Sequence, residues 1–204
     1  MGTSQTFEPT DGVWSQLAKE IGGQFLNALP DYYYLGGIGP TVHLKVEEWS
    51  IVLEGYKQST PDVERRHLPE IIRMRAPYND KDSFRFIIWR KNLLSGLGKI
   101  LGMQDVEIGD PGFDDEFIIQ CNDEVKLRAL FANARIKQLL HSQPYVFFQN
   151  REGESQPSST LLNTANTELY FLPRYDQTQD CALLKSLFEL FSETLRQLRS
   201  IGSA

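Results

Sequence analysis

Four successive segments between residues 42 and 89 alternate apolar and polar side chains with a period of two. They cover residues 42–46, 49–54, 72–76 and 84–89, and no helical pattern separates them. A period of two places one set of side chains on each face of a half-buried β-strand. Successive strands joined by short or moderate connections usually pair antiparallel. This part of the chain therefore predicts an antiparallel sheet that the remaining elements must cover.

Three segments show the spacing of three and four residues that is typical of an amphipathic helix, namely residues 11–29, 123–139 and 183–198. The last has the most regular apolar stripe, and we expect Leu187, Phe188 and Phe191 to be buried against the sheet. Asp176 and Gln179 have the spacing of a capping box before it. A short helix over residues 92–103 and three further strands, over residues 117–119, 145–149 and 169–172, complete the pattern.

The order of these elements defines the fold class. Strands come in blocks and do not alternate strictly with helices, which favours an α+β arrangement over a doubly wound fold. The sequence predicts a mainly antiparallel sheet of about six to seven strands. This sheet is expected to pack against an N-terminal helix, a middle helix and a long C-terminal helix.

The length of 204 residues fits one domain. We expect a flexible tail over residues 1–10 and a single α+β domain over residues 11–202. With 41% apolar and 24% charged residues, the chain can build a core without disulfides or metals. No apolar run approaches the roughly 20 residues that cross a bilayer, and the first residues lack the basic and apolar parts of a signal peptide. These features predict a cytoplasmic protein whose Cys121 and Cys181 are reduced.

No catalytic or cofactor motif is complete in the sequence. His43, His67 and His141 are isolated, so the spacing of a zinc site is missing. The glycines of residues 96–102 fit neither a phosphate loop nor a dinucleotide turn. Cys121 precedes a predicted helix start, where a thiolate is favoured, but a buried core cysteine is the simpler interpretation. We assign no catalytic residue, metal or cofactor, and favour a protein that is not an enzyme.

The charges are distributed unevenly along the chain. Residues 65–91 carry eight Lys and Arg against three acidic residues, whereas residues 104–124 carry eight acidic residues and no Lys or Arg. Arg73, Arg75 and Arg85 are therefore candidates for a face that binds an anionic ligand. The alternative, which we favour, is that the two segments neutralise each other. The acidic segment itself lacks the rhythm of a calcium loop, so cation binding there stays open.

The segment from Gly102 to Phe117 reads GMQDVEIGDPGFDDEF. It resembles a group of uncharacterised bacterial domains in which an FDxxF segment and a short apolar strand lead into a capped helix. The resemblance implies a bacterial, non-secreted protein and implies no activity. Within the segment, a tight turn at Gly112 would let Phe113 and Phe117 both enter the core, and Asp114 would then cap a backbone turn.

Two classes of function remain. The first is a non-enzymatic binding or protein-interaction module, favoured by the missing catalytic motifs and by the uneven charge. The second is a small-molecule or lipid-binding protein, or an enzyme, with a cleft between the sheet and the C-terminal helix, for which Trp49 and Trp89 are candidate lining residues. The partner is a protein or a small molecule. The net charge of −6 argues against nucleic acid, and homo-oligomer formation stays open.

Overall fold

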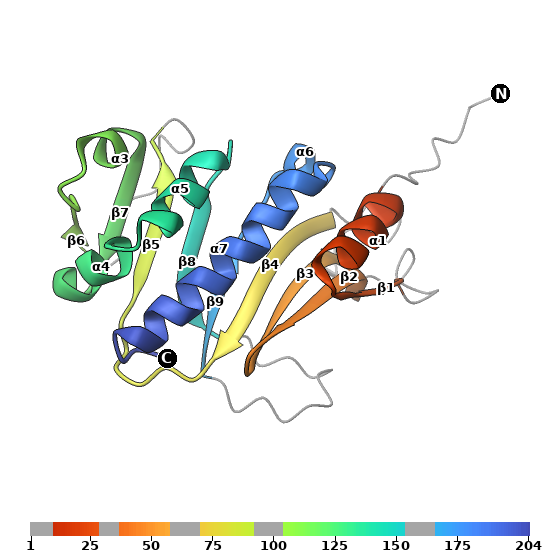
Figure 1. The fold of residues 1–204 in the computed structure, drawn as a ribbon, viewed down its shortest axis with the longest axis horizontal. Helices are drawn as coiled ribbons and strands as arrows, with labels where there is room; N and C mark the ends of the chain where they lie inside the picture. Colours follow the sequence, from red (N-terminus) through yellow and green to blue (C-terminus); the bar gives the residue numbers. More distant parts are fainter. Residues whose placement is uncertain (1–9, 29–36, 58–69, 92–103, 154–165) are drawn as a thin grey trace, which may run out of the picture.

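Nine strands of this chain form one sheet in which every described pair is antiparallel. The computed structural model describes residues 10–28, 37–57, 70–91, 104–153 and 166–204 (Figure 1). The strand order is β1-β2-β3-β4-β9-β8-β5-β7-β6. The predicted α+β class with a mainly antiparallel sheet and helices in the three expected places is confirmed. The sheet exceeds the expected size because the short strands β1 and β6 gave no sequence pattern.

The strands are β1 (Gln24–Leu26), β2 (Gly37–Val46), β3 (Trp49–Lys57), β4 (Glu70–Tyr78), β5 (Phe86–Arg90), β6 (Gln104–Asp105), β7 (Phe117–Cys121), β8 (Phe147–Glu152) and β9 (Thr167–Phe171). The helices are α1 (Thr10–Ile21), α3 (Pro111–Glu116), α4 (Glu124–Phe131), α5 (Ala134–Ser142), α6 (Tyr175–Thr178) and α7 (Cys181–Ser200). The predicted helix over residues 92–103 lies outside the described residues. None of the described helices is long and apolar enough to span a membrane.

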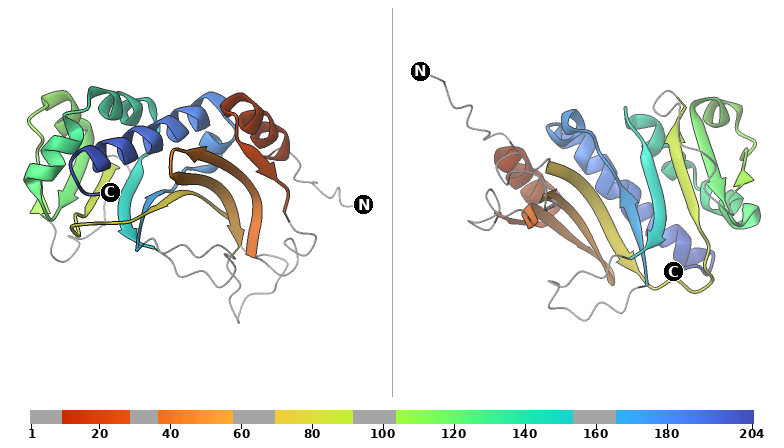
Figure 2. Two further views of the ribbon diagram at one scale, coloured as in Figure 1. Left: turned by 60° about the horizontal axis from the view of Figure 1, so that its bottom comes forward. Right: turned by 180° about the vertical axis from the view of Figure 1, so that it is seen from behind.

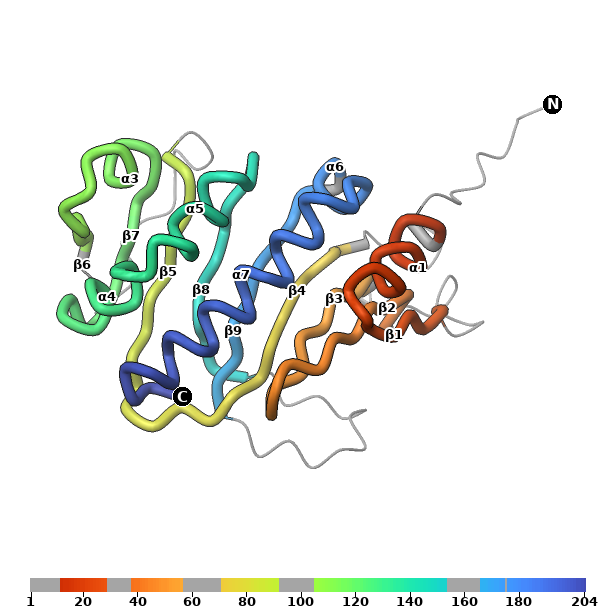
Figure 3. Tube along the Cα trace, viewed as in Figure 1, coloured from red at the N-terminus to blue at the C-terminus, as the bar shows by residue number. Residues whose placement is uncertain are grey.

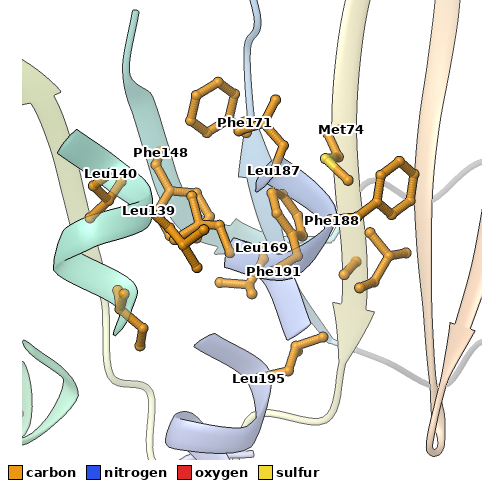
Figure 4. Packing of buried hydrophobic residues seen from close by; sticks show 14 of the residues in the cluster. Met74, Leu139, Leu140, Phe148, Leu169, Phe171, Leu187, Phe188, Phe191 and Leu195 are labelled. Atoms are coloured by element: carbon orange, nitrogen blue, oxygen red, sulfur yellow. The ribbon is translucent and has the colours of Figure 1, made fainter. Parts of the chain in front are cut away.

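The described helices lie on one face of the sheet, and α7 crosses its middle (Figure 2). The apolar side of α7 enters the core as predicted, with Leu187, Phe188 and Phe191 almost wholly inaccessible to solvent. Phe191 packs against Phe148 of β8 with ring centroids 5.4 Å apart (Figure 4). Alternation along each strand sends the other side chains to the opposite face, which none of the described helices covers.

Strands β4 and β5 are not neighbours, although they follow each other in sequence. The chain leaves β4, turns through residues 79–83 and returns as β5, while β9 and β8 fill the space between them (Figure 3). The turn is held by Asp80, whose carboxylate accepts hydrogen bonds from the amides of Asp82 and Ser83. Strands β4 and β5 therefore do not pair with each other: β4 pairs with β9 and β5 pairs with β8. This long-range arrangement is not encoded by local alternation.

The first helix ends earlier than its periodicity predicts. It stops at Ile21, not near residue 29, because Gly22 adopts a positive φ of 72°, a conformation that terminates helices at low cost for glycine. A Cβ atom at Gly23 would lie 2.6 Å from the carbonyl oxygen of His43, so the backbone passes β2 too closely for a side chain. The apolar residues beyond this point form β1.

The predicted middle helix is two helices. Asn133 separates α4 from α5 with extended backbone angles, and its side chain accepts a hydrogen bond from the amide of Arg135. Asn is favoured at such a cap because its side chain satisfies an amide of the first turn. The predicted cap of the last helix at Asp176 is wrong, because Asp176 belongs to the short α6. The cap of α7 is Asp180, whose carboxylate accepts hydrogen bonds from the amides of Ala182 and Leu183.

The burial expected for the two rings of the FDxxF segment is confirmed, but Gly112 lies within the short helix α3 and not in a tight turn. Phe113 and Phe117 are both buried, with ring centroids 4.5 Å apart. The Asp114 carboxylate accepts hydrogen bonds from the amides of Ile108, Gly109 and Asp110. These residues anchor the acidic loop to the core, which gives the segment a structural role.

Candidate binding sites on the two faces of the sheet

A group of buried and partly buried charges crosses four strands on the face that carries no described helix. We call Glu54, Arg73, Arg75, Arg151 and Glu168 the charge ladder. Strand register produces it: Glu54 of β3 lies opposite Arg73 of β4, and Arg151 of β8 lies opposite Glu168 of β9. Arg75 lies between these two pairs in β4 and faces Tyr170 of β9. Cross-strand neighbours of opposite charge attract each other, so this register favours the observed pairing.

The two carboxylates of the ladder each receive more than one arginine. Glu54 Oε1 accepts a hydrogen bond from Arg73 Nε at 2.7 Å and lies 2.9 Å from Arg75 Nε. Glu168 Oε1 accepts from Arg151 Nε at 2.9 Å, and Arg75 Nη1 lies 3.6 Å from its other oxygen. Only 2% of Glu54 and 1% of Glu168 is exposed. Charges this deeply buried are tolerated because they are paired.

Aromatic rings and a histidine border the ladder. The Arg151 guanidinium lies 3.5 Å from the ring centroid of Tyr170, and that of Arg73 lies 4.6 Å from Tyr56. Burial lowers the pKa of His43 on β2; the carboxylate of Glu54 opposes this shift and Arg75 adds to it. The neutral imidazole is therefore favoured in the folded protein.

His43 predicts a pH dependence of stability. The unfolded chain takes up a proton near the ordinary histidine pKa of 6.5, whereas the folded chain does so at a lower pH. The unfolded state therefore binds more protons in the window between these values, and the free energy of unfolding rises with pH through it. Urea denaturation from about pH 5 to about pH 7.5 measures this slope. A His43→Gln variant should show a smaller slope, and an unchanged slope would contradict the assignment.

The predicted anion-binding arginines do not form one group. Arg73 and Arg75 meet at Glu54, whereas Arg85 pairs with Asp80 at 2.5 Å and donates to Thr167 Oγ1. The expected neutralisation of the basic segment, residues 65–91, by residues 104–124 holds at Arg90, which pairs with Glu116. It is wrong for Arg73 and Arg75, whose described ionic partners lie in β3 and β9. Binding of an anionic ligand by these arginines stays a prediction.

The two candidate pocket tryptophans lie on opposite faces of the sheet. Trp49 belongs to the core beneath the helices, and the guanidinium of Arg199 lies 4.4 Å from its ring centroid. Trp89 alternates with the core residues Phe86 and Ile88, so it points to the other face. Its buried Nε1 has no hydrogen-bond partner among the described residues. The two side chains do not share one cavity, and a pocket-lining role for either stays a prediction.

Both cysteines carry thiols with a raised pKa. Burial is the main cause at Cys121, which is 2% exposed in the core. At Cys181 burial acts first and the nearby carboxylate of Glu20 adds to it. A raised pKa lowers the thiolate fraction, which is the opposite of what activates a nucleophile. Within the described ranges, no group of three or more His, Cys, Asp and Glu residues is placed to hold a metal ion.

An open groove of about 480 Å³ runs along α7 on the helical face. Its walls are α7 and the end of α1, and its floor includes β2. Ile21, Leu44, Ala182 and Phe188 supply its apolar surface. Ile21 and Leu44 are only half-buried, and both pack against the main core. The core thus reaches the surface between α1 and α7, and we call this hollow the α7 groove.

Charged side chains form the rim of the α7 groove. Lys185 Nζ lies 2.8 Å from Glu20, Glu189 pairs with Arg135, and Arg196 pairs with Glu47 of the β2–β3 turn. The walls are fixed relative to each other, because the buried indole of Trp14 in α1 donates to the carbonyl of Thr178 just before α7. The expected cleft between sheet and C-terminal helix is therefore a groove beside α7; the side of α7 that faces the sheet is packed.

A second hollow of about 510 Å³ lies at the other end of the sheet, lined by residues of β6, β7 and α4. Two of its carboxylates already serve the local structure: Asp114 holds three loop amides, and Glu124 pairs with Arg128. Arg128 also donates to the carbonyls of Glu107 and Ile108. These contacts give Asp114, Glu124 and Arg128 structural partners. The rim charges of the α7 groove are paired too, so we rank that groove first because of the apolar side chains that line it.

The comparisons with known proteins give a fold and no family. No family model matches the chain, and no curated protein matches it. Among solved structures, it is similar to the mycobacterial trehalose monomycolate transport factor A, TtfA. The two share 11% sequence identity with a TM-score of 0.54, and the match covers 97% of this chain and 98% of TtfA. At this identity the similarity shows that the two proteins have the same overall fold.

Proposed function

We propose that this protein is a non-enzymatic binding protein and that the α7 groove is its binding site. The observation that carries the proposal is the half-buried apolar lining of the groove, where Ile21 of the wall and Leu44 of the floor extend the core to the surface. An apolar strip bordered by charged residues is typical of a surface that a partner covers. The cost of leaving Leu44 in water is recovered when the partner removes it from solvent.

The fold shared with TtfA supports the same reading. The name of that protein describes a trehalose monomycolate transport factor. Fold does not determine function, so the argument for this chain depends on its own groove. A partner whose apolar surface covers the groove floor and whose polar edges meet the charged rim would complement this groove.

The proposal predicts that the groove binds an apolar probe. We expect 1-anilinonaphthalene-8-sulfonate to bind the folded protein at one site with enhanced fluorescence. A Leu44→Glu substitution places a carboxylate on the groove floor and should weaken this binding by roughly tenfold, since burying a charge among apolar groups is costly. Fluorescence titration measures the dissociation constant of each variant.

Two further variants make this test specific. Ala182→Glu changes one end of the groove and is tolerated structurally, because an acid is favourable in the first turn of a helix; it should weaken the dye as well. Ile71→Glu changes a partly exposed residue on the opposite face and serves as the matched control. Dye binding that survives both groove variants, or that is lost only in Ile71→Glu, would contradict the proposal.

A further inference from the structure

The shape of the α7 groove restricts what can occupy it. The groove is open along its length and is not an enclosed cavity. Sites for small ligands usually surround 70–90% of the ligand surface, so an alkyl chain lying here would keep much of its surface in water. An amphipathic helix needs burial on only one face and keeps its polar face in solvent. The open shape therefore favours a helix over a lipid chain.

The length of the groove also fits a helix. Its lining on α7 extends from Ala182 to Arg196. At 1.5 Å per residue this is about 21 Å, the length of roughly 14 helical residues. The walls are themselves two helices on a sheet, so a third helix would continue the existing layer. Ala182 and Ser192 are small residues of the lining and permit close approach of a helix backbone.

The charges of the rim have a fixed order along α7. The charge is positive at Lys185, negative at Glu189 and positive at Arg196, and these residues are spaced by four and seven positions. Each is close to half-exposed, and each is paired with another exposed side chain. Exposed ion pairs contribute little to stability, so these partners can be exchanged at little cost. Spacings of four and seven place the three charges along one side of α7, as at the edges of a coiled-coil contact.

We infer that the α7 groove binds an amphipathic helix of a partner protein that carries an acid, a base and an acid opposite Arg196, Glu189 and Lys185. This inference rests on the proposed function, since it names the partner of the same groove. An antiparallel orientation relative to α7 is favoured by the helix dipoles. Read from its N-terminus, the partner helix carries an acid, then a base seven residues later, then an acid four residues after that.

A charge-swap experiment tests the inference with synthetic peptides. The first probe is a 16-residue peptide, held helical by one lactam bridge, with apolar residues on one face and the acid–base–acid order at its edge. The second has the three charges reversed. Fluorescence anisotropy should show the first binding the native chain roughly tenfold more tightly than the second, the effect expected of two to three surface pairs. The combined K185E and R196E variant with E189K should reverse this preference.

The remaining outcomes separate the inference from the proposed function. Equal binding of both peptides to both proteins, or no peptide binding, would overturn the inference. If the dye still binds the groove in that case, the proposed function stands without it. Dodecanoate serves as the lipid probe. If dodecanoate binds tightly and displaces the dye while neither peptide binds, the ligand is an alkyl chain and the inference of a helical partner is wrong. The charge-swapped variant is checked by its melting curve, and an R128E variant outside the groove should leave the peptide preference unchanged.

Discussion

Replacing Phe191 by alanine is expected to lower the free energy of unfolding by about 3–5 kcal/mol. Its ring lies on the side of α7 that faces the sheet, is wholly buried and contacts Phe148 of β8 (Figure 4). The loss combines removal of apolar area from the core with the cavity that remains. Urea denaturation followed by circular dichroism measures the change.

A variant that keeps most of the side-chain volume tests whether the loss of stability comes from the cavity. Phe191→Leu keeps most of the volume and should cost clearly less than the alanine variant. Ala182→Glu, on the exposed side of the same helix, should leave the unfolding midpoint nearly unchanged. An unaltered midpoint for Phe191→Ala would mean that α7 does not lie against the sheet as described.

Replacing Glu54 by glutamine is expected to cost about 3–5 kcal/mol, the loss typical when one partner of a buried ion pair is removed. The neutral amide has nearly the same shape, so the change isolates the charge. Arg73 and Arg75 would then keep their guanidinium groups in a buried position without the carboxylate oxygen that they share. The free energy of unfolding from urea titration is the measurement.

The matched control is Glu124→Gln, which breaks the exposed pair with Arg128 in α4 and should change stability by less than about 0.5 kcal/mol. A second variant, Glu168→Gln, should resemble Glu54→Gln, because Arg75 and Arg151 meet there. If Glu54→Gln behaved like the exposed control, the charge ladder would contribute nothing to folding. Its role would then have to be sought in ligand binding.

Strong local periodicity was enough to predict most of the fold. The stripe of the last helix placed Leu187, Phe188 and Phe191 in the core, and alternation in β2 to β4 assigned the two faces of the sheet. The errors arose where a single residue overrides a pattern. Gly22 ends α1 through its positive φ, and Asn133 divides the middle helix by capping α5. Apolar spacing continues across both positions, so it could not reveal either break.

The candidate sites were harder to predict because they depend on which strands are neighbours. Alternation showed that Arg73 and Arg75 share a face, but their partners Glu54 and Glu168 come from β3 and β9. The position of β9 beside β4 is a long-range choice that local sequence does not encode. The one available signal was the parity of Glu54, which alternates with Leu53 in β3. The α7 groove joins α1, β2 and α7, and no single segment contains its pattern.

The measurement that tests the groove most directly is a map of backbone amide chemical shifts during titration of the labelled protein with the acid–base–acid peptide. Two-dimensional NMR reports each amide separately, so the binding site is read without mutation. The account predicts that the largest shifts cluster at Ile21, at Leu44 and along residues 182–196. Shifts confined to the opposite face, around Tyr56, Ile71 and the charge ladder, would show that the protein binds its partner there and would contradict the α7 groove as the binding site.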